Sequence, residues 1–272
     1  NLDIDYYNRL TSDKYADFTL PSTTGFSSVK NNNGKLRNSG FEMQVSRPAI
    51  GSHYLSENYG NGISIKSGTI KLDSVKNYSI YAGNGRKGRF EVNLAASEID
   101  ITGTIYGAGG NITITPRTDG IMKISPSDQA EGRTLKDNSI LLTNGSTLTI
   151  NKDSAELKQM QITGKINVDG EGSSLLANMT GDSSIAPRKG SSSTVAIEAS
   201  NGGSVNLNMG GANSSITGDV NAITGTGSSI SLNLFEAHQE GNLKAEGNNT
   251  LNAVYSGRNS SLTGTADNKG IM

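Results

Sequence analysis

A polar phrase that occurs twice constrains this chain more than any other feature. SSITG at residues 214–218 returns as SSLTG at residues 260–264, an offset of 46 in residue number (260 − 214). Gly241 lies midway, at an offset of 23 from both Gly218 and Gly264 (241 − 218 and 264 − 241). The spacing predicts a structural repeat, with the two phrases at the same position two repeats apart.

Longer matches support the repeat. GGSVNLNM at residue 202 returns as GSSISLNL at an offset of 25 (227 − 202) and as NNTLNAVY after a further 21 (248 − 227). ITGKINVDGEGSSLLANM at residues 162–179 matches ITGDVNAITGTGSSISLNL at an offset of 54 (216 − 162). That interval equals two repeats if one carries a surface insertion, for which APRKGSSS at residues 186–193 is the candidate.

Within the repeats, apolar residues alternate with polar ones over short stretches. NITIT at residues 111–115, SVNLNM at 204–209 and SISLNL at 229–234 are examples, and Gly, Asn, Asp and Ser separate them. This alternation predicts strands with one buried face, and no window has a convincing helical period.

Such a repeat of two or three short strands buries its apolar face only against its neighbours. The sequence therefore predicts an all-β solenoid, the parallel β-helix, with coils of roughly 21–25 residues. The strands of successive coils would lie about 4.8 Å apart.

Residues 1–55 differ from the rest because aromatic side chains gather there: Tyr6, Tyr7, Tyr15, Phe18, Phe26 and Phe41. The open end of a solenoid exposes unpaired strand edges, which must be covered. We therefore expect residues 1–55 to form a cap and the first coils, and residues 56–272 to form the β-helix.

The composition limits the environment and the partners. The chain of 272 residues has no cysteine, which favours export through an oxidising compartment without disulfides. It contains no apolar run near the length of a membrane span. The net charge of −1 gives no general attraction to nucleic acids or membranes. We expect the chain to be a fragment that ends within a repeat, at DNKGIM.

Two long phrases resemble a known family. GNLKAEGNNTLNAVYSGRNSSLTGTADNKG and SSITGDVNAITGTGSSISLNL are similar to passenger domains of monomeric type V autotransporters, notably the self-associating adhesin group. The resemblance covers about residues 60–270 and is one of style and period. It implies a right-handed β-helix, exported to the surface of a Gram-negative bacterium by a C-terminal barrel that is not in this sequence. It also implies adhesion, aggregation or biofilm formation, by self-association or by binding host glycans or matrix proteins.

Candidate catalytic residues are few. GDSS at residues 181–184 resembles the Gly-Asp-Ser-Gly motif of serine proteases but lacks the second glycine, whose backbone helps to form the oxyanion hole. The histidines, His53 and His238, lie in no recognisable base motif. Glu98 and Asp100 share one outward strand face, where they could serve a polysaccharide-degrading enzyme or simply be solvated. With no cysteine and no clustered histidine, we expect no metal, no cofactor and no enzymatic activity.

One basic cluster is a candidate binding site. GNGRKGRF at residues 83–90 places Arg86, Lys87 and Arg89 in a glycine-rich turn, with Tyr81 nearby in sequence. These side chains could hold a sulfated glycan, a glycosaminoglycan or extracellular DNA, because cations attract polyanions. An aromatic ring beside them could stack on a sugar. The alternative is a solvated loop without a ligand.

Four asparagines alternate with core residues on predicted outward faces: Asn206, Asn208, Asn233 and Asn252. At equivalent positions of successive repeats, each amide could bond the one above and form an internal ladder. The same amides could form a polar zipper against a second rod, where many hydrogen bonds of about 1 kcal/mol each add up. The sequence is compatible with an adhesin, with a polysaccharide-degrading or polysaccharide-binding protein of the lyase or tailspike type, and with a structural spacer.

Overall fold

The computed structural model describes residues 2–19, 28–46, 50–51, 62–85, 88–130 and 132–271, with side chains from residue 62 onward except at 75–77, 85, 133 and 270–271. Strands account for 72% of the chain and helix for 2%, so the predicted all-β class is confirmed. Among the described residues, the helix is α2 (Arg133–Asp137). The strands are β1 (Leu2–Thr19), β2 (Ser28–Ser46), β3 (Ile50–Gly51), β4 (Gly62–Lys66), β5 (Thr69–Gly85), β6 (Gly88–Arg89), β7 (Glu91–Ala108), β8 (Asn111–Ser125), β9 (Asn138–Thr143), β10 (Thr147–Ile150), β11 (Gln159–Thr163), β12 (Lys165–Asp169), β13 (Ser174–Met179), β14 (Asp182–Ala186), β15 (Val195–Ser200), β16 (Ser204–Thr217), β17 (Asp219–Thr224), β18 (Ser229–Glu240), β19 (Leu243–Ser256), β20 (Ser261–Thr263) and β21 (Ala266–Ile271).

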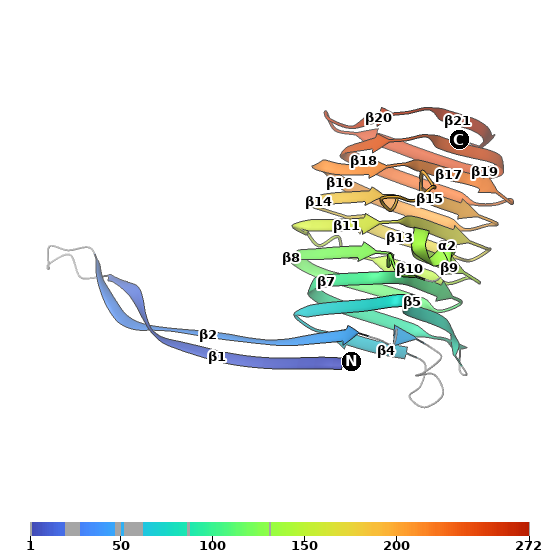
Figure 1. The fold of residues 1–272 in the computed structure, drawn as a ribbon. Helices are drawn as coiled ribbons and strands as arrows, with labels where there is room; N and C mark the ends of the chain where they lie inside the picture. Colours follow the sequence, from blue (N-terminus) through green and yellow to red (C-terminus); the bar gives the residue numbers. More distant parts are fainter. Residues whose placement is uncertain are drawn as a thin grey trace.

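Most pairings are parallel and join strands one repeat apart in sequence. One set of partners runs through five strands: Ile101 with Ile124, Ile124 with Ile162, Ile162 with Ile185, and Ile185 with Ile216. We call the stretch of chain from one of these partners to the next a tier. A row of residues paired from tier to tier is called a column. Figure 1 shows the strands from β4 to β21 stacked one above another in this way. Each tier is therefore hydrogen-bonded in parallel to the tier before it in the sequence.

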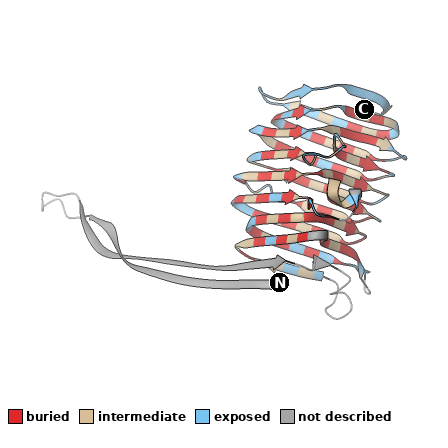
Figure 2. Ribbon diagram, in the orientation of Figure 1, coloured by how far each residue is buried: buried red, intermediate tan, exposed pale blue. Residues whose placement is uncertain are grey.

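Alternating burial follows the sequence pattern closely. Within one tier, Val205 and Ile216 of β16 and Val220 of β17 are buried, and each belongs to a different column. Figure 2 shows buried residues alternating with exposed or intermediate ones along the stacked strands. The buried aliphatic side chains form one continuous cluster. Each buried Val, Leu, Ile, Met or Phe side chain contributes about 1.5–3 kcal/mol, which a single isolated tier could not obtain.

The predicted repeat is confirmed by the register. Ser215 of the first repeated phrase pairs with His238, and His238 pairs with Ser261 of the second phrase. The two phrases therefore occupy one position, two tiers apart. The predicted glycine spacing has a steric reason: a β-carbon on Gly241 would lie 2.4 Å from the carbonyl oxygen of Gly218.

The predicted insertion is also confirmed. The partners Ile162 and Ile185 differ in residue number by 23 (185 − 162), whereas the next partners, Ile185 and Ile216, differ by 31 (216 − 185). The longer tier contains the loop between β14 and β15. Nη1 of Arg188 in this loop lies 2.9 Å from Oδ1 of Asp128, and its Nη2 lies 3.8 Å from Oδ1 of Asp137 at the end of α2. The insertion is thus tied to the side of the stack.

The N-terminal strands pair in both directions. β1 and β2 are antiparallel partners, and residues 42–46 of β2 pair in parallel with residues 69–73 of β5. The last part of β2 therefore lies beside the first tiers. The side chains of residues 1–61 lie outside the described residues, so a capping role for residues 1–55 stays a prediction.

Candidate functional site

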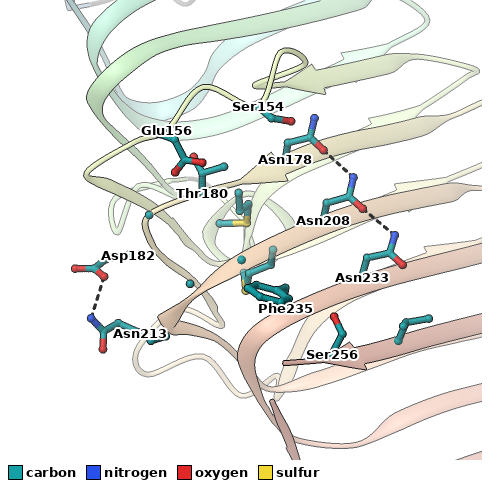
Figure 3. Close-up of a pocket in the computed structure, with 17 residues that line it drawn as sticks. Ser154, Glu156, Asn178, Thr180, Asp182, Asn208, Asn213, Asn233, Phe235 and Ser256 are labelled. Carbon is teal, nitrogen blue, oxygen red and sulfur yellow. Dashed lines mark hydrogen bonds between the residues drawn. The ribbon is translucent and has the colours of Figure 1, made fainter. Parts of the chain in front are cut away.

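A groove of about 860 Å³ opens on the side of the stack and crosses several tiers. Figure 3 shows that it is bordered by a row of asparagines on one side and by Asp182 and Asn213 on the other, with Phe235 between. Strands β13, β16, β18 and β19 supply most of its lining. Parallel stacking repeats the outward asparagine position in successive tiers, and this row forms one border of the groove.

The row of asparagines is a hydrogen-bonded amide ladder. Asn178, Asn208 and Asn233 are register partners on β13, β16 and β18. Nδ2 of Asn208 donates to Oδ1 of Asn178 at 2.7 Å, and Nδ2 of Asn233 donates to Oδ1 of Asn208 at 2.8 Å (Figure 3). All donors therefore point the same way, which lets neighbouring bonds polarise one another.

The two ends of the ladder differ. At one end, Nδ2 of Asn178 donates to the backbone carbonyls of Asn151 at 3.0 Å and Lys152 at 3.2 Å. At the other end, the next residue in the column after Asn233 is Val254, which has no amide. The ladder thus begins at the exposed amide of Asn233 and ends where Asn178 donates to backbone carbonyls.

Apolar surface accompanies the ladder. Phe235 is 56% exposed and Val254 is 46% exposed, and both line the groove. Among the described residues, Leu262 of β20 is the other large apolar side chain that is exposed, at 36%. Two of the three exposed large apolar side chains among the described residues therefore line this groove.

The charged side chains of the groove are acidic. Glu156 and Asp182 are exposed, and Oδ1 of Asp182 accepts a hydrogen bond from Nδ2 of Asn213 at 3.0 Å. No lysine or arginine is among the described residues that line the groove. Its field therefore disfavours anions.

The four predicted asparagines occupy two columns rather than one. Asn208 and Asn233 are direct partners in the ladder, as the ladder hypothesis required. Asn206 instead pairs with Ser231, and Ser231 pairs with Asn252. Asn206 and Asn252 are both exposed, in a parallel column separated by a serine. The prediction of equivalent positions was therefore right within each pair and wrong for the four together.

The predicted basic cluster is described only in part. Arg86 and Lys87 lie outside the described residues. Arg89 uses Nη1 to donate to the carbonyl oxygen of Gly145 at 2.5 Å and to Oδ1 of Asn111 at 3.4 Å. These contacts join β6 to neighbouring tiers, so Arg89 has a structural role, and its binding role stays a prediction.

Tyr81 belongs to a cluster of three tyrosines. Its ring centroid lies 5.4 Å from that of Tyr106, its register partner on β7, and 5.7 Å from that of Tyr78. The rings of Tyr78 and Tyr106 are 4.8 Å apart. Burial raises the pKa of Tyr81, and the nearby Tyr106 hydroxyl raises it further. The rings pack against one another at an angle, which favours a structural role for the cluster.

The catalytic candidates are dispersed. Ser183 of the GDSS phrase is 1% exposed, and its hydroxyl donates to the carbonyl of Thr180 at 2.7 Å. Nδ1 of His238 lies 2.8 Å from Oγ of Ser261, and His53 lies outside the described residues. Asp100 lies in one column with two basic residues, its register partners Lys71 and Lys123. The described residues therefore bring together no nucleophile, base and orienting group.

The sequence predictions named neither Asn178 nor Phe235 of the groove lining. Asn178 could have been found, because SSLLANM aligns with SSISLNL and puts Asn178 opposite Asn233. Phe235 follows the alternating stretch SISLNL at an outward position. The outward residues of that stretch are polar, and Phe235 is apolar. An apolar residue out of phase with its strand is the signal that would have identified it.

Two negative findings concern metals and membranes. Within the described part of the chain, no three His, Cys, Asp or Glu side chains gather as metal ligands would. The same residues include no helix with the length and apolar character needed to cross a bilayer.

Comparisons of the chain with models of known protein families, with curated proteins and with solved structures gave no match.

Proposed function

We propose that the stacked tiers form a right-handed parallel β-helix and that the chain is a passenger domain of a type V autotransporter. The support is the parallel register of the regular tiers near the C-terminus. There the residue numbers of partners advance by 25 from Val205 to Ile230 and by 21 from Ile230 to Leu251 (230 − 205 and 251 − 230). The handedness rests on the resemblance to autotransporter passengers.

The proposed function is that of a bacterial cell-surface adhesin, acting in attachment, aggregation or biofilm formation. The observation that carries it is the groove, where the ladder from Asn178 to Asn233 runs beside the exposed ring of Phe235. A polymer or a second rod lying along the stack would meet similar groups in each tier. Many modest contacts of this kind give avid binding without any single strong one.

Binding rather than catalysis fits the chemistry of the groove. Its functional groups are amides, hydroxyls and apolar side chains, with Glu156 and Asp182 as the acids. Asp182 accepts a hydrogen bond from Asn213, and the adjacent Ser183 is buried. A general acid or base needs a partner poised across the reacting bond, and the groove provides recognition groups instead.

The test is display of the chain on a bacterium that does not aggregate by itself. The cells should settle faster and attach better to surfaces than cells without the chain. The double substitution Asn208→Ala with Phe235→Ser should remove most of this gain, whereas Asn206→Ala with Asn252→Ala should retain it. Equal loss in both variants, or no gain on display, would rule out the groove as the adhesive surface.

Sedimentation of the purified chain separates the two modes of adhesion. Concentration-dependent dimers that the Asn208→Ala and Phe235→Ser substitutions abolish would indicate a second copy as the partner. A monomer at every concentration, from a chain that still confers attachment, would indicate a host or matrix polymer.

A further inference from the structure

We infer that the groove bordered by Asn178, Asn208, Asn233 and Phe235 is a binding site for an uncharged polysaccharide. This inference rests on the proposed adhesin function and names the ligand class for it. The ligand class differs from the polyanions predicted for Arg86, Lys87 and Arg89.

The amide ladder leaves regularly spaced hydrogen-bonding groups for a ligand. A side-chain amide has two N–H donors and a carbonyl with two lone pairs. Asn208 uses one donor toward Asn178 and accepts one bond from Asn233, so one N–H and one lone pair are left over. Asn233 donates to Asn208 and meets Val254, not an amide, on its other side. Sugar hydroxyls both donate and accept, so they can pair with each of these groups.

Phe235 supplies the apolar part of the site. Phe235 is 56% exposed and lines the groove, and Val254, at 46% exposure, lies in the neighbouring tier. The ring offers a flat apolar face that can cover the C–H face of a pyranose. A few convergent polar groups beside an aromatic side chain are the usual composition of a small-molecule or glycan site.

The charges select against acidic polymers. Glu156 and Asp182 line the groove and are exposed, and the lining contains no basic residue among those described. Sulfated glycans, uronic acid polymers and DNA would be repelled by these carboxylates. A neutral chain would meet no such penalty, which is why the uncharged class is favoured.

The repeat of the ladder also fits a polysaccharide. Successive amides belong to successive tiers, which lie roughly 4.8 Å apart in a sheet of this kind. One tier is therefore about as tall as one hexose unit in an extended chain. A polysaccharide running along the stack could present one unit to Asn178, the next to Asn208 and the next to Asn233.

The experiment is affinity electrophoresis of the purified chain in gels that contain dextran, laminarin, mannan or soluble starch, with heparin, alginate and DNA in parallel gels. At least one neutral polymer should slow the protein, and added salt should leave that retardation nearly unchanged. Phe235→Ser should weaken the apparent affinity at least tenfold, and Asn233→Ala several-fold. Asn252→Ala, an exposed asparagine of β19 that is not in the groove lining, is the matched control and should bind normally.

Two results would overturn the inference. One is the absence of retardation by every neutral polymer. The other is neutral binding that survives both Phe235→Ser and Asn233→Ala, measured on variants whose thermal unfolding matches the parent chain. If neutral polymers fail while displayed cells still aggregate, the adhesin function stands and the ligand class is wrong. If polymers bind but displayed cells neither aggregate nor attach, the site stands and the adhesin function fails.

Discussion

Gly241 lies directly above Gly218, so close that a β-carbon on Gly241 would be 2.4 Å from the carbonyl oxygen of Gly218. Gly264 repeats this relationship one tier higher, with a distance of 2.1 Å to the carbonyl oxygen of Gly241. All three glycines have positive φ angles, between 108° and 151°. This corner of the stack therefore excludes side chains for two independent reasons, conformation and contact.

Gly241→Ala should destabilise the chain by about 3 kcal/mol or more, because the new methyl group meets backbone that cannot move without disturbing the tier below. The control is Gly247→Ala, at φ 64° with no atom within 4 Å of its added β-carbon. That change should cost only about 1 kcal/mol, the cost of the left-handed conformation. Urea unfolding of both variants measures the difference, and equal losses would contradict the proposed contact.

The amide ladder should be energetically coupled. Asn178→Ala and Asn208→Ala each remove the hydrogen bond of 2.7 Å that joins them. A double-mutant cycle should therefore give an interaction free energy of about 1 kcal/mol.

A control cycle uses Asn206 and Asn252, which Ser231 separates in their column. Their interaction free energy should lie within about 0.5 kcal/mol of zero. Similar coupling in both cycles would show that the ladder bond has no specific role.

Stability should fall at high pH. Burial raises the pKa of Tyr255 to about 12, and its hydroxyl is buried without a hydrogen-bond partner. A tyrosine in the unfolded chain ionises at about pH 10, whereas Tyr255 in the folded chain stays neutral to a higher pH. Ionisation above about pH 10 therefore favours the unfolded state. The stabilisation is complete below about pH 10 and is lost as the pH rises toward about 12.

Urea unfolding at pH about 9 and about 11 tests this dependence. Tyr255→Phe should reduce the fall in unfolding free energy between these two conditions. It should not abolish the fall, because the pKa values of Tyr78 and Tyr81 are also raised by burial. An unchanged pH dependence in the variant would contradict the assignment to Tyr255.

The insertion should be held mainly by Arg188. Arg188→Met removes the ion pairs to Asp128 and Asp137, while Oγ of Ser191 still donates to Asp137 at 2.9 Å. The global free energy of unfolding should change by less than about 1 kcal/mol, because Asp128 is largely exposed and the pair with Asp137 is long, at 3.8 Å. Trypsin should nevertheless cut after Lys189 several times faster in the variant. Mass spectrometry of the fragments checks this, with Asp128→Asn as a milder comparison.

The sequence repeat predicted the register of the regular tiers but could not predict every core residue. Gln239 pairs with Ile216 below and Leu262 above, at a position where alternation calls for an apolar side chain. It is 1% exposed, and its Nε2 donates to the carbonyl of Gly218 at 2.8 Å. Helix α2 was not predicted either, because it lies in a lengthened tier without similarity to the other repeats.

The candidate site was less predictable than the fold. The period placed Asn208 and Asn233 at equivalent positions, as the register has them, but it grouped them with Asn206 and Asn252, which lie in another column. The position of the groove depends instead on where the chain leaves the regular strand path. Residues 210–213 interrupt the register of β16 and form one wall of the groove. That path reflects local turn geometry rather than periodicity. For the same reason, the contact between Arg89 and Gly145 had no counterpart in the sequence pattern.

The stacked glycines also bear on how the length of such a chain can change. Residues 219–241 contribute β17 and β18, and they span the step from Gly218 to Gly241. Their removal would join Gly218 to Asn242 and leave the columns above and below in register, with the molecule shorter by roughly 4.8 Å. Recombination between the coding segments of two tiers would produce such a deletion or the matching duplication in one event. The number of tiers, and with it the reach of the molecule, can therefore vary by whole units while the core stays intact.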